Sequence, residues 1–380
     1  MDAGRVAHAL TIVHTEASTG WGGQEIRILS EAAGLRRRGH DVSLLAAHGA
    51  RIVDEAPRFD VPVTALPIGR KRPQGVRALV RELGKARPDI VNTHSSTDSW
   101  LAAIASRFIA NDRVPVLVRT RHVSVPVPRD FATRWLYRKA MTRTVTTGQA
   151  LAEQLVRDNG LDASRVDSVP TGIDAAHYAR LDKALARAQL ALPADVPLVG
   201  IAATLRSWKG HRYLVEAMRH LRHADSRLLI VGDGPQREAL VRQVASLGLE
   251  TRVVFAGQRD DVAPWLHASD VFALPSYANE GVPQALLQAM FASVPCVTTD
   301  AGAIPEIARD GDTATIVEKE NAVSLAAGID ALLADRTRAA AQAARALSFV
   351  SARYTLEAML DRMEAVFRQA LADRSHESAH

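Results

Sequence analysis

Two cations that could bind a diphosphate stand three residues apart in the segment TLRSWKGH, as Arg206 and Lys209. The segment follows a short apolar run and precedes an amphipathic one, so we expect a junction between a loop and a helix. A guanidinium fork and a lysine point charge at such a junction suit two linked phosphate groups. The alternative interpretation is a pair of solvated surface cations.

A second candidate for anion binding is the glycine-rich segment TGWGGQEI, which contains Gly20, Gly22 and Gly23. Glycines before a helix let the backbone approach a ligand closely, and the helix N-terminus favours negative charge. The spacing lacks the full G-x-G-x-x-G pattern of a dinucleotide-binding loop. A plain turn before the first helix is therefore the alternative.

Two histidines stand directly after, or close to the end of, apolar runs that resemble strands. His94 follows residues 90–93, and His122 comes soon after residues 116–119. Ligands of doubly wound sheets collect at the carboxyl ends of the strands. We expect His94 to line a binding cleft. His122 is either a ligand-facing histidine or a structural one whose hydrogen bonds are satisfied.

Short apolar runs rich in β-branched residues alternate with longer amphipathic segments along the chain. The expected strands form two series, 9–14, 41–46, 90–93, 116–119 and 144–146, and then 198–202, 228–231, 253–256, 271–274 and 296–298. The expected helices include 24–38, 77–86, 212–221, 236–247 and 284–292. This alternation predicts an α/β protein with two parallel, doubly wound sheets.

The length of 380 residues also favours two domains. We place a first domain at 1–175, a linker at 176–196 and a second domain at 197–353. Residues 354–380 should form an amphipathic helix that packs back toward the first domain, followed by a polar tail.

The composition is that of a soluble protein. The single cysteine, Cys296, excludes an internal disulfide and suits a reducing cytoplasm. The apolar run 6–13 reads as a strand rather than a signal peptide. The charge-free stretch 281–299 contains two prolines and two glutamines, so it reads as a helix and a strand rather than a membrane span.

Positive charge is concentrated in the first half of the chain. Residues 1–190 carry 28 Lys and Arg against 19 Asp and Glu, whereas residues 191–380 carry 19 against 23. The basic excess is either an ordinary solvated surface or a face for an anionic partner such as lipid headgroups or a phospholipid acceptor. No nucleic-acid-binding motif accompanies it, so we expect no nucleic-acid partner.

An ordered set of motifs resembles the retaining glycosyltransferases of family 4, which have the GT-B fold. The set covers nearly the whole chain. It consists of GGQEIRILSEAAGLRRRGHDV, NTHSS, RTRH, TGID, Lys209-Gly210, VGDGP, VVFAG, SDVFALPS, EGVPQALLQAM, VPCVTTD and IPEI. The resemblance implies two Rossmann-like domains facing across a cleft. It also implies a nucleotide-sugar donor bound mainly by the second domain and an acceptor bound mainly by the first.

The resemblance implies roles for individual residues. Arg206 and Lys209 would hold the donor diphosphate and stabilise the leaving group, Glu280 would bind sugar hydroxyls, and His122 would lie near the reacting sugar. Residues expected to contact the donor through backbone or side chain are Gly22, Gly23, Gly257, Gln258, Gly281, Val282, Pro283 and Gln288. On the acceptor side we expect His94 and Arg121, with Arg121 near a phosphate.

We expect no cofactor and no metal, because no Asp-x-Asp motif is evident and the acids of RDD at 259–261 read as surface residues. Cations and N–H dipoles would then take up the charge of the leaving diphosphate.

Several positions depart from the family pattern. Arg206 follows Leu205 where the family often has an arginine before the leucine, Thr171 replaces an asparagine, and Ala301-Gly302-Ala303 replaces paired glycines. The main departure is Gln288, where a second glutamate is usual. A carboxylate accepts hydrogen bonds from both ribose hydroxyls, whereas an amide offers one acceptor oxygen. One hypothesis is a deoxyribose donor such as a dTDP-sugar.

We therefore expect a cytoplasmic enzyme, peripheral at the inner face of a membrane. It would transfer a sugar with retention to an anionic or lipid-linked saccharide acceptor in cell-envelope polysaccharide or lipopolysaccharide synthesis. Two alternatives remain. One is another enzyme on the same fold, a sugar-nucleotide epimerase or a phosphorylase. The other is a non-catalytic nucleotide-sugar-binding relic.

Overall fold

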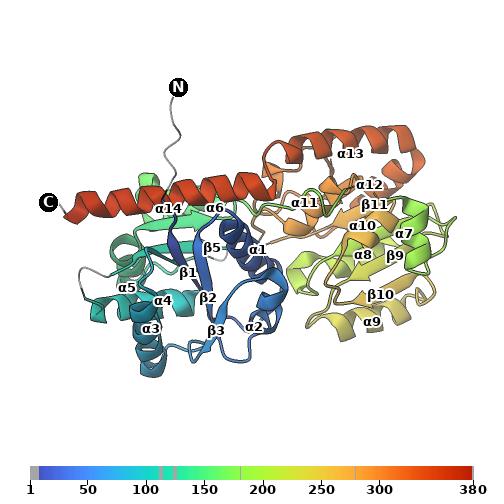
Figure 1. Cartoon of the computed structure of the whole chain (residues 1–380). Coiled ribbons are helices and arrows are strands. Elements are labelled where there is room, and N and C mark those ends of the chain that lie inside the picture. Colours follow the sequence, from blue (N-terminus) through green and yellow to red (C-terminus); the bar gives the residue numbers. More distant parts are fainter. Residues whose placement is uncertain (1–7, 111–113, 123–125, 180, 279, 379–380) are drawn as a thin grey trace. The chain divides into compact units, whose positions relative to one another are not determined.

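The structure is a computed structural model that describes residues 8–110, 114–122, 126–179, 181–278 and 280–378. The chain forms two compact units (Figure 1). The first runs up to Gly172 and resumes at Leu356, and the second spans Ile173–Thr355. Each unit has its own hydrophobic core.

A seven-stranded parallel sheet in the order β3-β2-β1-β4-β5-β6-β7 forms the centre of the first unit. Its strands are β1 (Thr11–Glu16), β2 (Asp41–Ala47), β3 (Val63–Leu66), β4 (Ile90–Thr93), β5 (Val116–Arg121), β6 (Arg143–Thr146) and β7 (Val166–Ser168). Its α-helices are α1 (Gly23–Arg37), α2 (Arg51–Glu55), α3 (Pro73–Ala86), α4 (Ser96–Ala105), α5 (Phe131–Trp135), α6 (Gln149–Asn159) and α14 (Leu356–Ser378). Short turns of other helix types are η1 (Ala56–Phe59), η2 (Ser106–Phe108), η4 (Leu136–Ala140) and η5 (Ala163–Arg165).

The second unit contains a six-stranded parallel sheet in the order β10-β9-β8-β11-β12-β13. Its strands are β8 (Leu198–Ala202), β9 (Arg227–Val231), β10 (Val253–Gly257), β11 (Val271–Leu274), β12 (Cys296–Thr298) and β13 (Thr315–Ile316). Its α-helices are α7 (Lys183–Gln189), α8 (His211–Ala217), α9 (Arg237–Ser246), α10 (Ala263–Ala268), α11 (Gln284–Phe291), α12 (Ala322–Ala334) and α13 (Arg336–Ser351), with short turns η6 (Ser207–Lys209) and η7 (Ile304–Glu306).

The prediction of two parallel, doubly wound sheets is confirmed. All ten expected strands are present, with ends shifted by up to two residues. The expectations did not include β3, β7 and β13, which are short strands at sheet edges. Edge strands are partly exposed and therefore lack the continuous apolar runs by which central strands are recognised.

The C-terminal helix α14 packs against α1 within the first unit (red in Figure 1). A close approach is possible because α1 has Gly34 at the contact, where a Cβ atom would overlap the side chain of Leu360. Arg38, directly after α1, pairs with three carboxylates of α14, those of Glu357, Asp361 and Glu364.

The described parts of the segment that we expected as a linker, 176–179 and 181–196, belong to the second unit. Its helix α7 packs against α10 and contributes the buried side chain of Arg187. That guanidinium donates to Asp270 Oδ2 at 2.6 Å and to the carbonyl oxygen of Ala268 at 3.0 Å. One of the charged residues that suggested a linker, Arg187, thus forms an ion pair that holds the segment against the rest of the second unit.

Among the described residues, no helix is both long and apolar enough to cross a bilayer.

Candidate functional site

Each sheet has a point where the strand order reverses, between β1 and β4 in the first unit and between β8 and β11 in the second. Loops at the carboxyl ends of such neighbouring strands diverge and leave space for a ligand. Apart from Gly257 and Gln258, which lie at the end of β10, the residues predicted from the sequence lie at or beside these two places. Each place is described by itself.

In the second unit, Lys209 and Glu280 form an ion pair. Nζ of Lys209 donates to Oε1 of Glu280 at 2.7 Å and to Oε2 at 2.9 Å. Lys209 ends η6, in the loop after β8, and Glu280 lies in the loop after β11. The lysine side chain is 21% exposed and the glutamate side chain 6%. The two residues predicted to bind phosphate and sugar therefore contact one another directly.

Two glycines allow the loops around this ion pair to pack closely. Gly210 has φ +75°, and a Cβ atom there would overlap the carbonyl oxygen of Pro275. Gly302 has φ +57°, and a Cβ atom there would overlap the carbonyl oxygen of Glu280. That same oxygen accepts a hydrogen bond from Ala303 N at 3.1 Å. Positive φ and lack of space both favour glycine at these positions, which fixes the backbone on either side of the pair.

Arg206 is exposed, and its guanidinium carbon lies 5.7 Å from the ring centroid of Trp208. The half-buried indole thus holds the arginine by a cation–π contact. Trp208 is itself anchored, because its carbonyl oxygen accepts from Tyr277 N at 2.9 Å. Arg206 therefore stays available to solvent and to a ligand near Lys209.

Helix α11 begins at Gln284, shortly after Glu280, with Pro283 as its N-cap. Gly281, Val282 and Pro283 are buried, and Gln288 is half-buried one turn into the helix. The N-terminal N–H groups of a helix attract phosphate and sugar oxygens. The remaining predicted donor residues, Gly257 and Gln258, lie at the carboxyl end of β10, where Gly257 has φ +73° and Gln258 is exposed.

Three polar side chains near this edge were not singled out from the sequence. Ser276 Oγ, Gln284 Oε1 and both ring nitrogens of His211 are buried, and within the described ranges they have no hydrogen-bond partner. Burial, with Lys209 nearby, lowers the pKa of His211 to about 3. Buried polar atoms are normally hydrogen-bonded, so these three side chains are further candidates for contact with a ligand. A serine, a glutamine and a histidine are too common for the sequence to reveal this.

In the first unit, three histidines come from the carboxyl ends of adjacent strands. His14 lies in β1, His94 directly follows β4, and His122 directly follows β5. Nδ1 of His14 lies 2.9 Å from Nε2 of His94, and Nδ1 of His94 lies 2.9 Å from Nε2 of His122. The structure thus brings together the two predicted histidines and adds His14, which the sequence analysis missed.

Burial lowers the pKa of all three imidazoles. The pKa of His14 falls to about 3, first through burial and then through the charge of Arg27. Burial is also the main cause for His94 and His122, with Arg27 and Arg119 adding to it. The rings are therefore neutral near pH 7.

Arg27 itself is fully buried on α1 and pairs with Glu31, with Arg27 Nε 3.5 Å from Glu31 Oε2. Its Nη1 donates to the carbonyl oxygen of Val169 at 2.6 Å. Charged residues on an amphipathic helix usually face solvent, so this internal cation could not be recognised from the sequence.

Arg121, the last residue of β5, is half-buried next to His122 in the chain. Its Nη1 donates to Tyr137 Oη at 3.4 Å. Burial lowers its pKa, with the nearby charge of Arg119 contributing in the same direction.

The start of α1, where Gly22 and Gly23 lie, is lined by carboxylates. Oε1 of Glu16 accepts a hydrogen bond from Ser18 N at 2.6 Å, and its Oε2 accepts from the side chain of Gln24. Burial, and next the charge of the Asp98 carboxylate, raise the pKa of Glu16 to about 8. A phosphate at this helix N-terminus would meet the protonated, uncharged Glu16 rather than a cation, which distinguishes this place from the cationic edge of the second unit.

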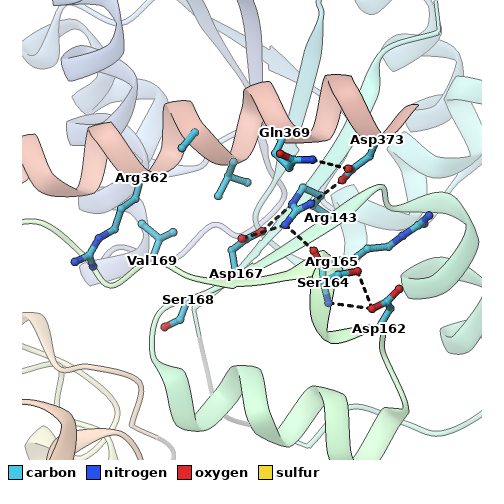
Figure 2. Close-up of a pocket in the computed structure, with 12 residues that line it drawn as sticks. Arg143, Asp162, Ser164, Arg165, Asp167, Ser168, Val169, Arg362, Gln369 and Asp373 are labelled. Atoms are coloured by element: carbon cyan, nitrogen blue, oxygen red, sulfur yellow. Dashed lines mark hydrogen bonds and ion pairs between the residues drawn. The ribbon is translucent and has the colours of Figure 1, made fainter. Parts of the chain in front are cut away.

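A cavity of about 980 Å³ lies elsewhere in the first unit, between η5, β7 and α14 (Figure 2). None of the residues predicted from the sequence lines it. At its centre Arg143 donates to Asp167 Oδ2 at 2.9 Å and to Asp373 Oδ2 at 2.6 Å, so its charge is balanced by acidic groups of β7 and α14. We interpret this ion-pair network as structural, because it joins the edge strand β7 to α14.

Two family models match the chain in succession. Residues 21–177 match the model described as Glycosyltransferase Family 4, and residues 196–335 match that described as Glycosyl transferases group 1. One similar protein is the D-inositol 3-phosphate glycosyltransferase of Nocardia farcinica (strain IFM 10152), 27% identical over 90% of this chain and 85% of its own. Another is the N-acetyl-alpha-D-glucosaminyl L-malate synthase of Bacillus anthracis, 34% identical over 39% of each chain.

Solved structures share the fold. A glycosyltransferase from Rickettsia africae ESF-5 superposes with a TM-score of 0.84 at 21% identity, over 96% of this chain and 99% of its own. HepE from Anabaena, solved with UDP-glucose, superposes with a TM-score of 0.82 at 22% identity, over 95% and 100%. The two family matches cover most of the sequence in the same order as its two sheets. The chain belongs to the glycosyltransferases of group 1 and family 4, with the GT-B fold.

Proposed function

We propose that this glycosyltransferase transfers a sugar from a nucleotide-sugar donor to a hydroxyl group of an anionic acceptor, with retention at the anomeric carbon and without a metal ion. The observation that carries the proposal is the contact of Lys209 with Glu280 beside exposed Arg206 and the start of α11. A diphosphate needs cations and N–H dipoles, and a sugar needs a hydrogen-bond acceptor. This edge of the second unit supplies both.

In the proposed reaction the bond between the anomeric carbon and the donor phosphate oxygen breaks, and a bond to the acceptor oxygen forms on the same face. The acceptor proton moves to the departing phosphate oxygen. Lys209, Arg206 and the N–H groups at the start of α11 stabilise the charge that develops there. Glu280 binds sugar hydroxyls, and His122 meets the reacting sugar. Gly257, Gln258 and Gln288 contact the nucleoside, with Gln288 at the ribose.

An anionic acceptor is supported by the chemistry named in two relatives, D-inositol 3-phosphate and L-malate. Both carry a hydroxyl group and negative charge. In this chain Arg121 would contact the negative group, with His94 and His122 beside it. Lipid-linked precursors of cell-envelope polysaccharide or lipopolysaccharide form the second acceptor class that we propose to assay.

An exposed surface of the first unit suits an anionic membrane. It combines cations held on tryptophans, Lys71 on Trp100 and Arg107 on Trp135, with two exposed phenylalanines. Phe108 is 70% exposed and Phe131 is 85% exposed. Aromatic rings with neighbouring basic residues favour binding to anionic headgroups. We propose that the enzyme associates peripherally with the cytoplasmic face of the membrane through this surface.

Sedimentation with vesicles tests this association. The protein should sediment with vesicles that contain phosphatidylglycerol but not with pure phosphatidylcholine, and F108S/F131S should reduce sedimentation. Val323, exposed on the second unit, provides V323S as a control. Equal sedimentation of F108S/F131S and V323S would remove this surface from the proposal.

The donor is identified by a thermal-shift screen of UDP-, GDP-, ADP- and dTDP-sugars, followed by a transfer assay with inositol phosphate, malate and lipid-linked saccharides. The amide of Gln288 offers fewer hydrogen-bond acceptors than a carboxylate, which favours a nucleotide with a deoxyribose. We therefore expect dTDP to bind more tightly than UDP in calorimetry. The Anabaena neighbour was solved with UDP-glucose, which makes UDP the competitor to measure first. Equal or tighter UDP binding would exclude the dTDP preference.

The same assays separate the alternatives. An epimerase would consume the donor without an acceptor, whereas a transferase needs both. A non-catalytic relic would bind donors but transfer nothing. Loss of transfer in E280A, with transfer by the wild-type protein, excludes the relic.

A further inference from the structure

His14, His94 and His122 form what we call the histidine row. The planes of the first two rings are 15° apart and those of the second two 32° apart, with ring centroids 5.2 Å apart in both cases. Together with nitrogen-to-nitrogen distances of 2.9 Å, these values mean that the rings meet edge to edge through hydrogen bonds. The row crosses three adjacent strands at the place where their order reverses.

Neutral imidazoles restrict the hydrogen positions in such a row. Each neutral ring carries one N–H and one acceptor nitrogen. Both nitrogens of His94 take part in contacts, so one must donate and the other accept. All hydrogens therefore point the same way along the row, either from His14 toward His122 or from His122 toward His14.

The buried end of the row decides between the two directions. Nε2 of His14 is buried and has no partner among the described residues. If the hydrogens pointed toward His14, this nitrogen would carry a buried N–H without an acceptor, which is rare in proteins. That N–H would also feel the positive charge of Arg27, which acts on His14. In the opposite direction Nε2 carries a lone pair, which a nearby cation favours.

We propose that His14 and His94 fix the tautomer of His122, so that its Nε2 accepts from His94 and its Nδ1 carries the hydrogen. Nδ1 of His122 has no partner within the described part of the chain, and His122 is half-buried. Resting on the proposed function, in which His122 meets the sugar, the row makes His122 a hydrogen-bond donor to a ligand oxygen and prevents it from acting as a general base.

The row does not conduct protons away from the ligand. Its inner end at His14 Nε2 contacts no group in the described ranges that could take up a proton. His14 and His94 are therefore positioning residues, which act only through the orientation and hydrogen position of His122.

Nitrogen NMR of the free protein, labelled with ¹⁵N-histidine, reports the tautomer of each ring without any substrate. His14, His94 and His122 should all appear as neutral rings protonated at Nδ1 at pH 7.5. Their signals are assigned by loss in H14N, H94N and H122N. The exposed His48 gives H48N as a control that should leave the three signals in place. An Nε2–H signal for His122 in the wild-type protein overturns the proposal, whatever the activity.

Two isosteric variants of His94 test the consequence for transfer. In H94N the amide N–H replaces the Nδ1–H donor toward His122, so His122 should keep its tautomer. In H94D a carboxylate faces His122 Nε2, which must then carry the hydrogen. We expect kcat of H94D to fall about tenfold below that of H94N, as for one lost hydrogen bond to a ligand. Equal kcat values for the two variants overturn the role assigned to the tautomer.

The outcomes also separate this inference from the proposed function. If the tautomers are as expected but H122A transfers sugar like the wild-type protein, the ligand contact of His122 fails and the donor site at Lys209 and Glu280 is unaffected. If no nucleotide-sugar binds at all, the proposed donor fails, whereas the NMR result still decides the direction of the row.

Discussion

Lys209 Nζ contacts both carboxylate oxygens of Glu280, at 2.7 and 2.9 Å. Each residue therefore balances the charge of the other. A donor diphosphate would share the lysine, and sugar hydroxyls would share the glutamate. The ion pair holds both side chains in place, so less rotamer entropy is lost when a donor binds.

Substitutions of Glu280 and Lys209 should affect the binding of nucleotide and of sugar differently. E280Q releases Lys209 from its ion pair, so the Kd for a free nucleoside diphosphate should fall while the Kd for the nucleotide-sugar rises. K209M should lower kcat/KM by about 100-fold or more, as for loss of one group that stabilises developing charge. Calorimetry with both ligands measures the first effect. Unchanged diphosphate binding in K209M would contradict the assignment of Lys209.

Gly302 supports Glu280 through backbone packing, and its substitution should act through this contact. In G302A the new Cβ would overlap the carbonyl oxygen of Glu280 at a φ of +57°, so the loop must move. We expect a loss of about 1–3 kcal/mol in the free energy of unfolding and weaker nucleotide-sugar binding. G311A is the control, because Gly311 has a similar φ of +69° but nothing within 4 Å of its Cβ position. If G302A and G311A bind the donor equally, the contact with Glu280 has no role in the site.

Glu16 should make the protein less stable as the pH rises. Its pKa increases from 4.5 to about 8 on folding, so the folded protein binds this proton more tightly than the unfolded chain. The contribution to stability is complete below about pH 4.5 and is lost progressively toward pH 8. Glutamine stays neutral, so E16Q should melt above the wild-type protein at pH 8.5 and gain less at pH 5.

Melting curves of E16Q and wild-type protein from pH 5 to 8.5 measure this difference. Each pKa unit corresponds to about 1.4 kcal/mol, so a gain of several degrees at pH 8.5 is expected. The histidine row contributes in the opposite sense, since its lowered pKa values cost stability as the pH falls below 6.5. That contribution is common to both proteins and cancels in the comparison. A pH-independent difference would mean that Glu16 is ionised in the folded state.

Arg143 should stabilise the first unit by joining β7 to α14. In R143M the carboxylates of Asp167 and Asp373 lose their shared partner (Figure 2). The guanidinium side chain is only 8% exposed, so we expect a loss of about 1–3 kcal/mol. R345M is the matched control, because Arg345 pairs with Asp312 on the surface with both side chains 46% exposed and should cost less than about 1 kcal/mol. Equal losses in denaturant titrations would show that Arg143 acts only as a surface ion pair.

Sequence periodicity predicted the two sheets because central strands need apolar residues on both faces. It did not predict β3, β7 or β13, which form only when a neighbouring strand offers hydrogen bonds. Patterning also suggested a linker at 176–196, since charged residues usually face solvent. The buried pair of Arg187 with Asp270 depends on a contact between residues far apart in the chain.

The candidate site, too, could be predicted from the sequence only where it depends on local pattern. The sequence could place four residues near the carboxyl ends of strands, because each lies beside a predicted strand or helix. These residues are Lys209, Glu280, His94 and His122. The row itself needs the strand order β1-β4-β5, which makes His14 a neighbour of His94. Nothing in the run that contains His14 indicates that order.

The return of α14 to the first unit has a consequence for biosynthesis. The second unit, Ile173–Thr355, is one uninterrupted segment, whereas the first unit needs Leu356 onward to cover α1. A chain emerging from the ribosome can thus complete the second unit while the face of α1 around Gly34 is still uncovered. The second unit would then finish folding before the first unit, whose N-terminal part emerged earlier.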